Sequence, residues 1–134
     1  MSKPLHTASI LIIEDDENSL LVTERLLQLA GAKKIVSFRS GVEALAGLPG
    51  PVDLVLLDLQ LRHEDGLQLG QQLRRDERLA SATLAALTAN VLSQDVQHVR
   101  EAGFDGLIGK PLSFELFAGQ VQQLLDGQPV WYTR

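Results

Sequence analysis

Residues 53–66 of the chain read DLVLLDLQLRHEDG. The apolar run at 54–57 does not alternate with polar residues, and neither does the run ILII at 10–13. Strands that are covered on both faces have this pattern, which is typical of a parallel sheet between two layers of helices. Asp58 follows the run at 54–57 directly. We therefore expect a buried strand that leads straight into a carboxylate.

Short β-rich runs and stretches with helical spacing alternate along the chain. We expect strands at 10–13, 35–38, 54–57, 83–87 and 104–108. Five other stretches carry apolar residues at helical spacing: Leu21, Val22, Leu26 and Leu29; Val42, Leu45 and Leu48; Leu69 and Leu73; Val96 and Val99; Phe114, Phe117, Val121 and Leu124. With right-handed crossovers, this alternation predicts an α/β fold with a doubly wound five-stranded parallel sheet and five helices. Its arrangement is the flavodoxin-like (βα)5 type with strand order 2-1-3-4-5.

Capping residues support the expected helix boundaries. Residues that are common N-caps precede four of the helices: Asn18 or Ser19, Ser40, Ser93 and Ser113. Glycines lie near the C-terminal ends of three: Gly31, Gly103 and Gly127. We assign residues 1–127 to one domain and residues 128–134 to a C-terminal tail that holds the only Trp and the only Tyr. The tail is either a short linker or a segment that folds back on the domain.

The composition is that of a single globular domain. The chain has 134 residues, of which 45% are hydrophobic and 22% charged, and its formal net charge is -5. This charge argues against nucleic acid or an anionic membrane as a partner. The chain has no Cys, which excludes a disulfide framework and a thiolate metal site. The N-terminus has no apolar stretch long enough for a signal peptide, so we expect a cytoplasmic protein.

Charged and polar side chains follow the expected strands, at the end of an open α/β sheet where ligands bind. Glu14 and Asp15 follow the first strand and Asp58 the third, while Lys110 follows the fifth. Three carboxylates in one place repel one another unless positive charge is present. Mg²⁺ is the simplest solution because it takes oxygen ligands and keeps several waters. A nucleotide-binding flavodoxin-like protein is disfavoured, because the acidic loop after the first strand would reject a free phosphate.

Four motifs in this order resemble the receiver domain of two-component response regulators: IIEDDE, DLVLLDLQLRHEDG, ALTANV and DGLIGKP. The resemblance runs from about Ser9 to Asp126. It implies transfer of a phosphoryl group from a phosphohistidine to one aspartate. The donor would be a histidine kinase or a histidine phosphotransfer protein, and a changed surface would then act on a downstream protein.

The resemblance assigns a role to each residue of the metal and acceptor site. Asp58 matches the phosphoacceptor, because a carboxylate attacks phosphorus when a metal and a lysine offset the charge on the phosphoryl oxygens. Asp15 matches the direct Mg²⁺ ligand, and Glu14 the ligand that binds through water. The backbone carbonyl of Gln60 matches the third protein ligand.

Three further residues match the groups that hold the phosphoryl oxygens. The Thr88 hydroxyl and the Ala89 backbone N–H would hydrogen-bond one oxygen, and Lys110 would form an ion pair with another. The family also typically has a cis bond between this lysine and the following proline, Pro111.

The sequence departs from the family at three positions. Leu107 stands where the family usually has an aromatic that moves with the threonine, so we expect signalling either to run through the backbone of the loop after Thr88 or to be weak. Arg62 and His63 replace the usual Pro and Gly after Asp58; they could gate the phosphodonor, contact a partner, or be ordinary loop residues.

Two amides stand at positions that set how fast water removes the phosphoryl group in this family. Gln60 and Asn90 lie two residues beyond Asp58 and Thr88. An amide can hydrogen-bond a water molecule but cannot deprotonate it. We therefore expect a phosphoryl lifetime of minutes or longer.

No output domain fits in the remaining residues, so a single-domain regulator that acts through protein contacts is expected. The surface of the fourth helix, fifth strand and fifth helix is the expected face, both for a target and for a homodimer. One alternative is a receiver that works as an adaptor without phosphate. A less favoured one is an aspartyl-phosphate phosphohydrolase, whose nucleophile normally follows the first strand and not the third.

Overall fold

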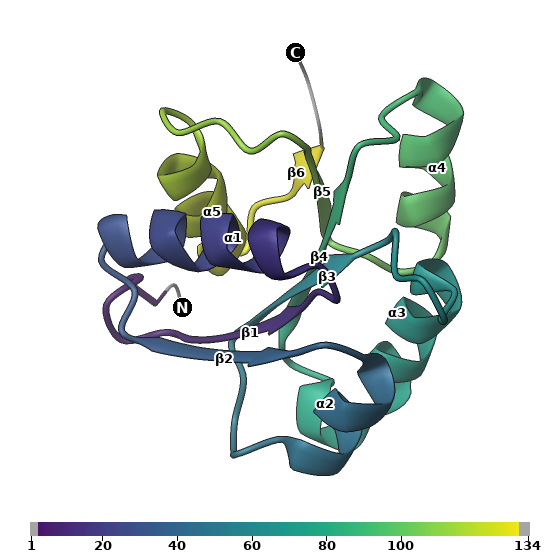
Figure 1. Cartoon of the computed structure of the whole chain (residues 1–134), viewed down its shortest axis with the longest axis horizontal. Coiled ribbons are helices and arrows are strands. Elements are labelled where there is room, and N and C mark those ends of the chain that lie inside the picture. Colours follow the sequence, from purple (N-terminus) through teal and green to yellow (C-terminus); the bar gives the residue numbers. More distant parts are fainter. Residues whose placement is uncertain (1–2, 132–134) are drawn as a thin grey trace.

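A sheet of parallel strands runs through the centre of the molecule (Figure 1). The computed structural model describes residues 3–131. The strands are β1 (Ser9–Ile13), β2 (Lys34–Phe38), β3 (Leu54–Asp58), β4 (Thr83–Thr88), β5 (Gly106–Gly109) and β6 (Val130–Trp131). Their order is β2-β1-β3-β4-β5-β6, and every neighbouring pair is parallel. The predicted order 2-1-3-4-5 is confirmed, and β6 is a sixth strand that the sequence analysis did not predict.

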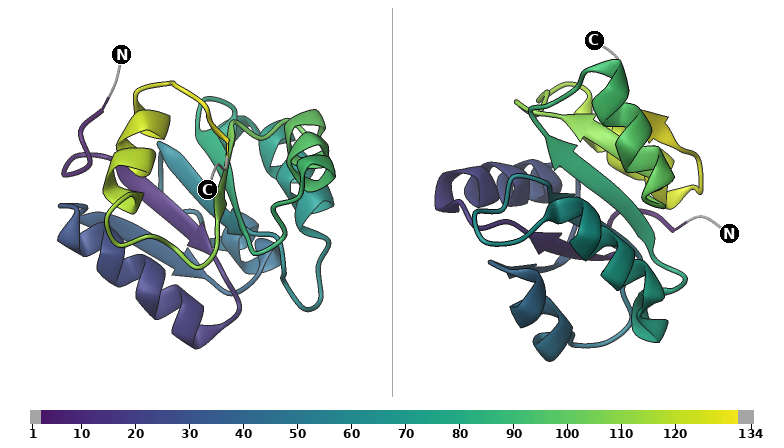
Figure 2. Two further views of the ribbon diagram at one scale, coloured as in Figure 1. Left: turned by 90° about the horizontal axis from the view of Figure 1, so that it is seen from above. Right: turned by 90° about the vertical axis from the view of Figure 1, so that its right-hand side faces the viewer.

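Five α-helices cover the two faces of the sheet (Figure 2). They are α1 (Glu17–Leu29), α2 (Gly41–Gly47), α3 (Gly66–Arg75), α4 (Ser93–Glu101) and α5 (Phe117–Leu125), and a 3-10 turn, η1, spans Glu77–Leu79. Helices α1 and α5 lie on one face, and α2, α3 and α4 lie on the other (Figure 1). The doubly wound α/β prediction is therefore confirmed.

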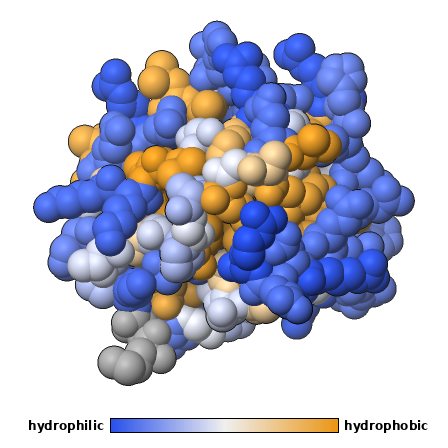
Figure 3. All heavy atoms as spheres, turned by 90° about the horizontal axis from the view of Figure 1, so that it is seen from below, coloured by the Kyte–Doolittle hydropathy of each residue, from blue (hydrophilic) through white to orange (hydrophobic). Residues whose placement is uncertain are grey.

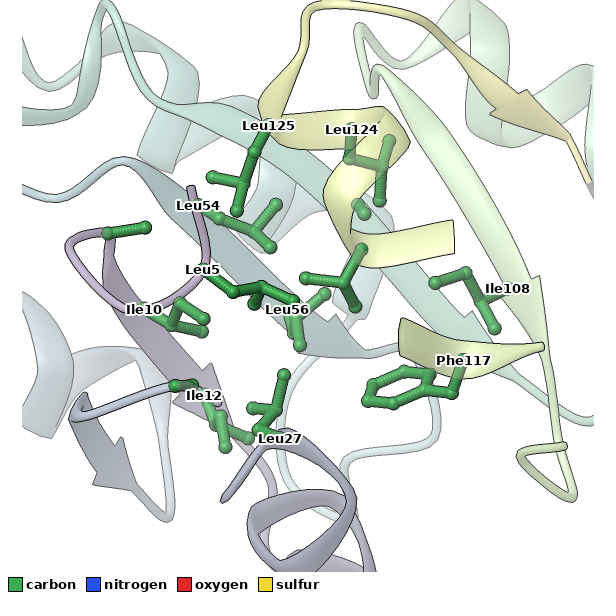
Figure 4. Close-up of a cluster of buried hydrophobic side chains, with 14 of the residues drawn as sticks. Leu5, Ile10, Ile12, Leu27, Leu54, Leu56, Ile108, Phe117, Leu124 and Leu125 are labelled. Atoms are coloured by element: carbon green, nitrogen blue, oxygen red, sulfur yellow. The ribbon is translucent and has the colours of Figure 1, made fainter. Parts of the chain in front are cut away.

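Each face of the sheet has its own hydrophobic cluster. Ile10 and Ile12 of β1 point to the α1 and α5 side, where they join Leu27 and Phe117 (Figure 4). The intervening side chains of β1 point to the α3 and α4 side, as does Leu107 of β5. Strand β3 is buried at all five positions, as the unbroken apolar run predicts.

The capping residues were predicted in part. The N-cap of α1 is Asp16, whose carboxylate accepts a hydrogen bond from the backbone N–H of Ser19, so the choice of Asn18 or Ser19 was wrong. Ser40 caps α2 as predicted. Helix α4 begins at Ser93, but its N-cap is Leu92.

The remaining boundary signals lie close to their predicted places. The Ser113 hydroxyl accepts from the backbone N–H of Leu116 in the turn that leads into α5. The three glycines predicted at helix ends, Gly31, Gly103 and Gly127, have φ values of 106°, 94° and 82°. Positive φ values in this range favour glycine.

Strand β6 lies in the predicted tail and packs beside β5. Val130 pairs with Gly106 and Trp131 with Leu107. The Arg100 guanidinium of α4 lies 4.9 Å from the centre of the Trp131 ring, a cation–π contact that holds the strand to the helix. The last three residues of the tail, 132–134, lie outside the described residues.

Helix α2 is short and leaves part of the sheet open. A hollow of about 280 Å³ is lined by Leu11, Val36 and Val52, among others. Figure 3 views the molecule from below and shows apolar side chains surrounded by hydrophilic ones.

Within residues 3–131, the structure has no helix that is both long and apolar enough to cross a membrane.

Candidate functional site

The carboxyl ends of four parallel strands bring the predicted residues to one end of the sheet. Glu14 directly follows β1, Asp58 ends β3, Thr88 ends β4 and Lys110 directly follows β5. Hydrogen bonds between strand ends fix this arrangement, because the backbone N–H of Lys110 donates to the carbonyl of Thr88 at 2.8 Å. The peptide bond between Lys110 and Pro111 is cis, as the resemblance implied.

The Lys110 ammonium lies between two buried carboxylates. Its Nζ is 2.7 Å from Asp58 Oδ2 and 2.8 Å from Glu14 Oε1. The Asp58 and Glu14 side chains are only 5% and 1% exposed. One ammonium group thus faces two carboxylates that water cannot solvate, and the three groups must share the available protons.

Burial and hydrogen bonding shift the pKa values of Glu14 and Asp58 in opposite directions. Burial raises the pKa of Glu14 to about 7, and its hydrogen bond with Asp58 adds to the rise. Burial alone would raise the pKa of Asp58, but hydrogen bonds from Glu14, Lys110 and the Gln60 backbone together lower it. Asp58 is therefore the acid that stays ionised, and Glu14 the one that holds a proton near neutral pH.

The same contacts keep the lysine charged. Burial alone would lower the pKa of Lys110, but its hydrogen bonds with Asp58 and Glu14 raise it above the usual value. A charged ammonium group beside an ionised carboxylate is what transfer of an anionic group to that carboxylate requires.

Asp15 faces the loop after β3 and not the ammonium group. Its Oδ2 accepts a hydrogen bond of 2.8 Å from the backbone N–H of Arg62. Over residues 3–131, the structure has no group of three or more His, Asp or Glu side chains placed to hold a metal ion. Asp15 therefore adds to this end of the sheet without joining the cluster of Glu14, Asp58 and Lys110.

The Gln60 side chain spans two residues that the resemblance places at the phosphoryl oxygens. Its Nε2 donates to Thr88 Oγ1 at 2.6 Å, and its Oε1 accepts from the Ala89 backbone N–H at 3.3 Å. The Gln60 backbone N–H also donates to Asp58 Oδ1 at 2.7 Å. The sequence analysis considered only the carbonyl of Gln60 and a role of its amide toward water, so it missed this bridge.

The departures from the family lie in different surroundings. Leu107 is fully buried in β5. Arg62 and His63 are exposed on the loop after β3, and Asn90 is exposed after β4. A cleft of about 440 Å³ opens beside Lys110, between the start of α1 and the loop after β5.

Known proteins with the same pattern identify the family. Residues 10–122 match the family described as the response regulator receiver domain, which is most of the chain. The chain belongs to this family. Receiver domains are signalling modules and not metabolic enzymes, so this receiver domain functions in two-component signal transduction.

This receiver domain matches only a small part of some relatives and nearly the whole length of others. It is 35% identical over 126 residues to the aerobic respiration control sensor protein ArcB of Escherichia coli, which is 93% of this chain but 16% of ArcB. It is 32% identical over 120 residues to the polar-differentiation response regulator DivK of Brucella ovis, which is 89% of this chain and 97% of DivK.

Solved structures confirm the fold. The chemotaxis response regulator CheY4 of Vibrio cholerae superposes with a TM-score of 0.79 at 21% identity, over 87% of this chain and 98% of CheY4. A signal receiver domain of a histidine kinase from Syntrophus aciditrophicus gives 0.78 at 29% identity, over 90% and 92% of the two chains.

Proposed function

We propose that this receiver domain accepts a phosphoryl group on Asp58 from a phosphohistidine. The observation that carries the proposal is the contact of 2.7 Å between Lys110 Nζ and Asp58 Oδ2 at the carboxyl ends of β3 and β5. The histidine belongs to a histidine kinase or a histidine phosphotransfer protein. The names of DivK, a response regulator, and ArcB, a sensor protein, support this class of partner.

The proposed reaction uses the ionised form of Asp58. A carboxylate oxygen attacks phosphorus, so that an O–P bond forms while the P–N bond of the phosphohistidine breaks. The electron pair of that bond leaves with the imidazole nitrogen. Lys110 balances the charge on the phosphoryl oxygens, and the Thr88 hydroxyl and Ala89 N–H donate hydrogen bonds to them.

The chemistry of the carboxylates and carbonyl at this end of the sheet fits Mg²⁺, which prefers hard oxygen ligands. We propose that Asp15, Asp58 and the Gln60 carbonyl bind it directly, and Glu14 through a water molecule. When bound, the ion supplies further neutralisation of the phosphoryl charge. Burial and the neighbouring Asp58 raise the pKa of Glu14 to about 7, and a bound cation would favour the ionised form, so Glu14 would give up its proton when the ion binds.

We propose that phosphorylation changes contacts with a downstream protein at the α4–β5–α5 face. Strand β6 places Trp131 beside β5 and α4, so Val130 and Trp131 would add to this face. We keep residues 1–127 as the domain and residues 128–134 as its C-terminal tail. A homodimer through the same face, a cytoplasmic location and a phosphoryl lifetime of minutes or longer remain predictions.

Incubation with phosphoramidate and Mg²⁺ tests the proposal. Intact mass spectrometry should detect the addition of one phosphoryl group to the wild-type chain and none in Asp58→Ala. The exposed Asp126 serves as a matched control, and Asp126→Ala should behave as the wild type. An unmodified wild-type chain would favour the adaptor alternative, and repeated turnover of a phosphomonoester would favour the phosphohydrolase.

A further inference from the structure

The Gln60 side chain is hydrogen-bonded to both residues that would hold the phosphoryl oxygens, and it takes the one hydrogen that the Ala89 backbone can donate. Ala89 has one backbone hydrogen to donate, and it points to Gln60 Oε1 at 3.3 Å. Thr88 Oγ1 accepts from Gln60 Nε2 at 2.6 Å and from the Asn90 backbone N–H at 3.0 Å. Both hydroxyl lone pairs and the Ala89 hydrogen are thus engaged within the chain.

The orientation of the Gln60 amide follows from its partners. A backbone N–H can only donate, so the amide oxygen must face Ala89. The amide nitrogen then faces Thr88, whose oxygen can accept. The two contacts are therefore consistent with each other and do not depend on an arbitrary choice between the amide oxygen and nitrogen.

Gln60 can leave this position without disturbing the core. It is an exposed residue in the loop after β3, whereas Thr88 is 1% exposed. The Gln60 backbone is held by the donation of its N–H to Asp58 Oδ1 at 2.7 Å. The side chain alone would have to rotate into solvent, where water would replace its two hydrogen bonds.

We propose that the Gln60 side chain is a latch that closes the phosphoryl-binding corner of the unphosphorylated domain. The latch is defined by the two hydrogen bonds of its amide to Thr88 and Ala89. Phosphorylation of Asp58 requires the bond to Ala89 to break, because the Ala89 hydrogen cannot serve two acceptors at full strength. The bond to Thr88 uses a lone pair of the hydroxyl and leaves its hydrogen free to donate to the phosphoryl group. This inference rests on the proposed function, and it adds an internal competitor for the phosphoryl group.

Two substitutions separate the hydrogen bonds from the bulk of the side chain. Gln60→Ala removes both, whereas Gln60→Met keeps a chain of similar length without amide hydrogen bonds. Each variant keeps the backbone carbonyl of residue 60. Gln71→Ala, at an exposed position of α3, is the matched control.

The rate of phosphorylation by phosphoramidate with saturating Mg²⁺ is the first measurement. Gln60→Ala and Gln60→Met should both react about three- to tenfold faster than the wild type, the factor for about one net hydrogen bond that no longer has to break. Gln71→Ala should react at the wild-type rate. The dissociation constant for Mg²⁺ should be the same in all four proteins.

The amide proton resonance of Ala89 is a second measurement, independent of the rate. Its chemical shift should differ between the wild type and Gln60→Ala before phosphorylation and agree after it.

Three results would overturn the latch while leaving the proposed function intact. The first is an unchanged or slower rate of phosphorylation in Gln60→Ala. The second is a faster rate in Gln60→Ala together with a wild-type rate in Gln60→Met. The third is an Ala89 amide chemical shift that is the same in the wild type and in Gln60→Ala before phosphorylation. If the wild type itself gains no phosphoryl group on Asp58, the proposed function and the latch are both wrong.

Discussion

Replacing Glu14 with glutamine should change how the stability of the domain depends on pH. The Glu14 side chain is 1% exposed. Burial and the hydrogen bond with Asp58 raise its pKa from 4.5 to about 7. Glutamine has the shape of a protonated glutamate but cannot ionise. The variant therefore has no proton to release at this position at any pH.

The sign of the effect follows from where the proton is held. Between pH 4.5 and about 7, the folded domain keeps a proton on Glu14 that the unfolded chain has released. The stabilisation from this group is complete below pH 4.5 and is lost as the pH rises through about 7. At about 1.4 kcal/mol per tenfold change in proton affinity, the whole loss is about 3 kcal/mol, and most of it falls between about pH 5 and pH 8. Asp58 does not interfere, because its pKa lies below 3.8.

Urea denaturation at a series of pH values without Mg²⁺ measures this difference. The free energy of unfolding of Glu14→Gln should rise by about 2–3 kcal/mol relative to that of the wild type between about pH 5 and pH 8. Glu115→Gln, a change at an exposed position, should follow the wild type throughout. If the curves of Glu14→Gln and the wild type stay parallel over this interval, Glu14 does not hold the proton assigned to it.

Three other substitutions test the packing and the helix ends. Leu107→Ala should lower the free energy of unfolding by about 2–5 kcal/mol in urea denaturation, because this side chain is fully buried; a loss below about 1 kcal/mol would contradict tight packing around it. Gly106→Ala should move β6 away from β5, because a Cβ there would lie 2.7 Å from the Val130 carbonyl oxygen. The emission of Trp131 should then shift to longer wavelength, and an unchanged spectrum would contradict the close approach. Asp65→Ala should cost about 1 kcal/mol, since its carboxylate accepts from two backbone N–H groups of α3. Asp65→Ser should restore most of this loss, and a fully stable Asp65→Ala would show that the cap is dispensable.

The sequence predicted the central strands well and the ends of the sheet poorly. Strands β1 and β3 have four consecutive apolar residues each, a length and pattern typical of strands that are buried on both faces. Strand β6 has two residues directly after Pro129, too few for any periodicity. Its position depends on Gly106, which lets the Val130 backbone approach, and that contact is not local in sequence.

Helix α1 was predicted, and its Leu26 packs against the core, but the rest of its buried face was not predicted. Leu21, Val22 and Leu29 have helical spacing, yet each is more than half exposed. Leu27 and Thr23 are buried instead, and the Thr23 hydroxyl donates to the Ser19 carbonyl at 3.0 Å. A buried threonine that bonds within its own helix gives no hydrophobic signal, so the apolar spacing indicated only part of the buried side.

The residues that meet at the site do so because each of them lies at the carboxyl end of a strand. Glu14, Asp58 and Lys110 meet because parallel strands end at the same side of the sheet. Their place in the chain could therefore be predicted. The direction of the Gln60 amide depends on a rotamer between two loops, and no residue pattern specifies it.

The short β6 has a consequence for how the domain meets other chains. A strand at the border of a sheet presents unpaired N–H and C=O groups that can recruit strands from neighbouring molecules and begin aggregation. Without β6, that border would be β5, an apolar and wholly buried strand. With β6, the sheet ends on this side in two residues held by the Arg100 contact, which offer a poor template for a foreign strand.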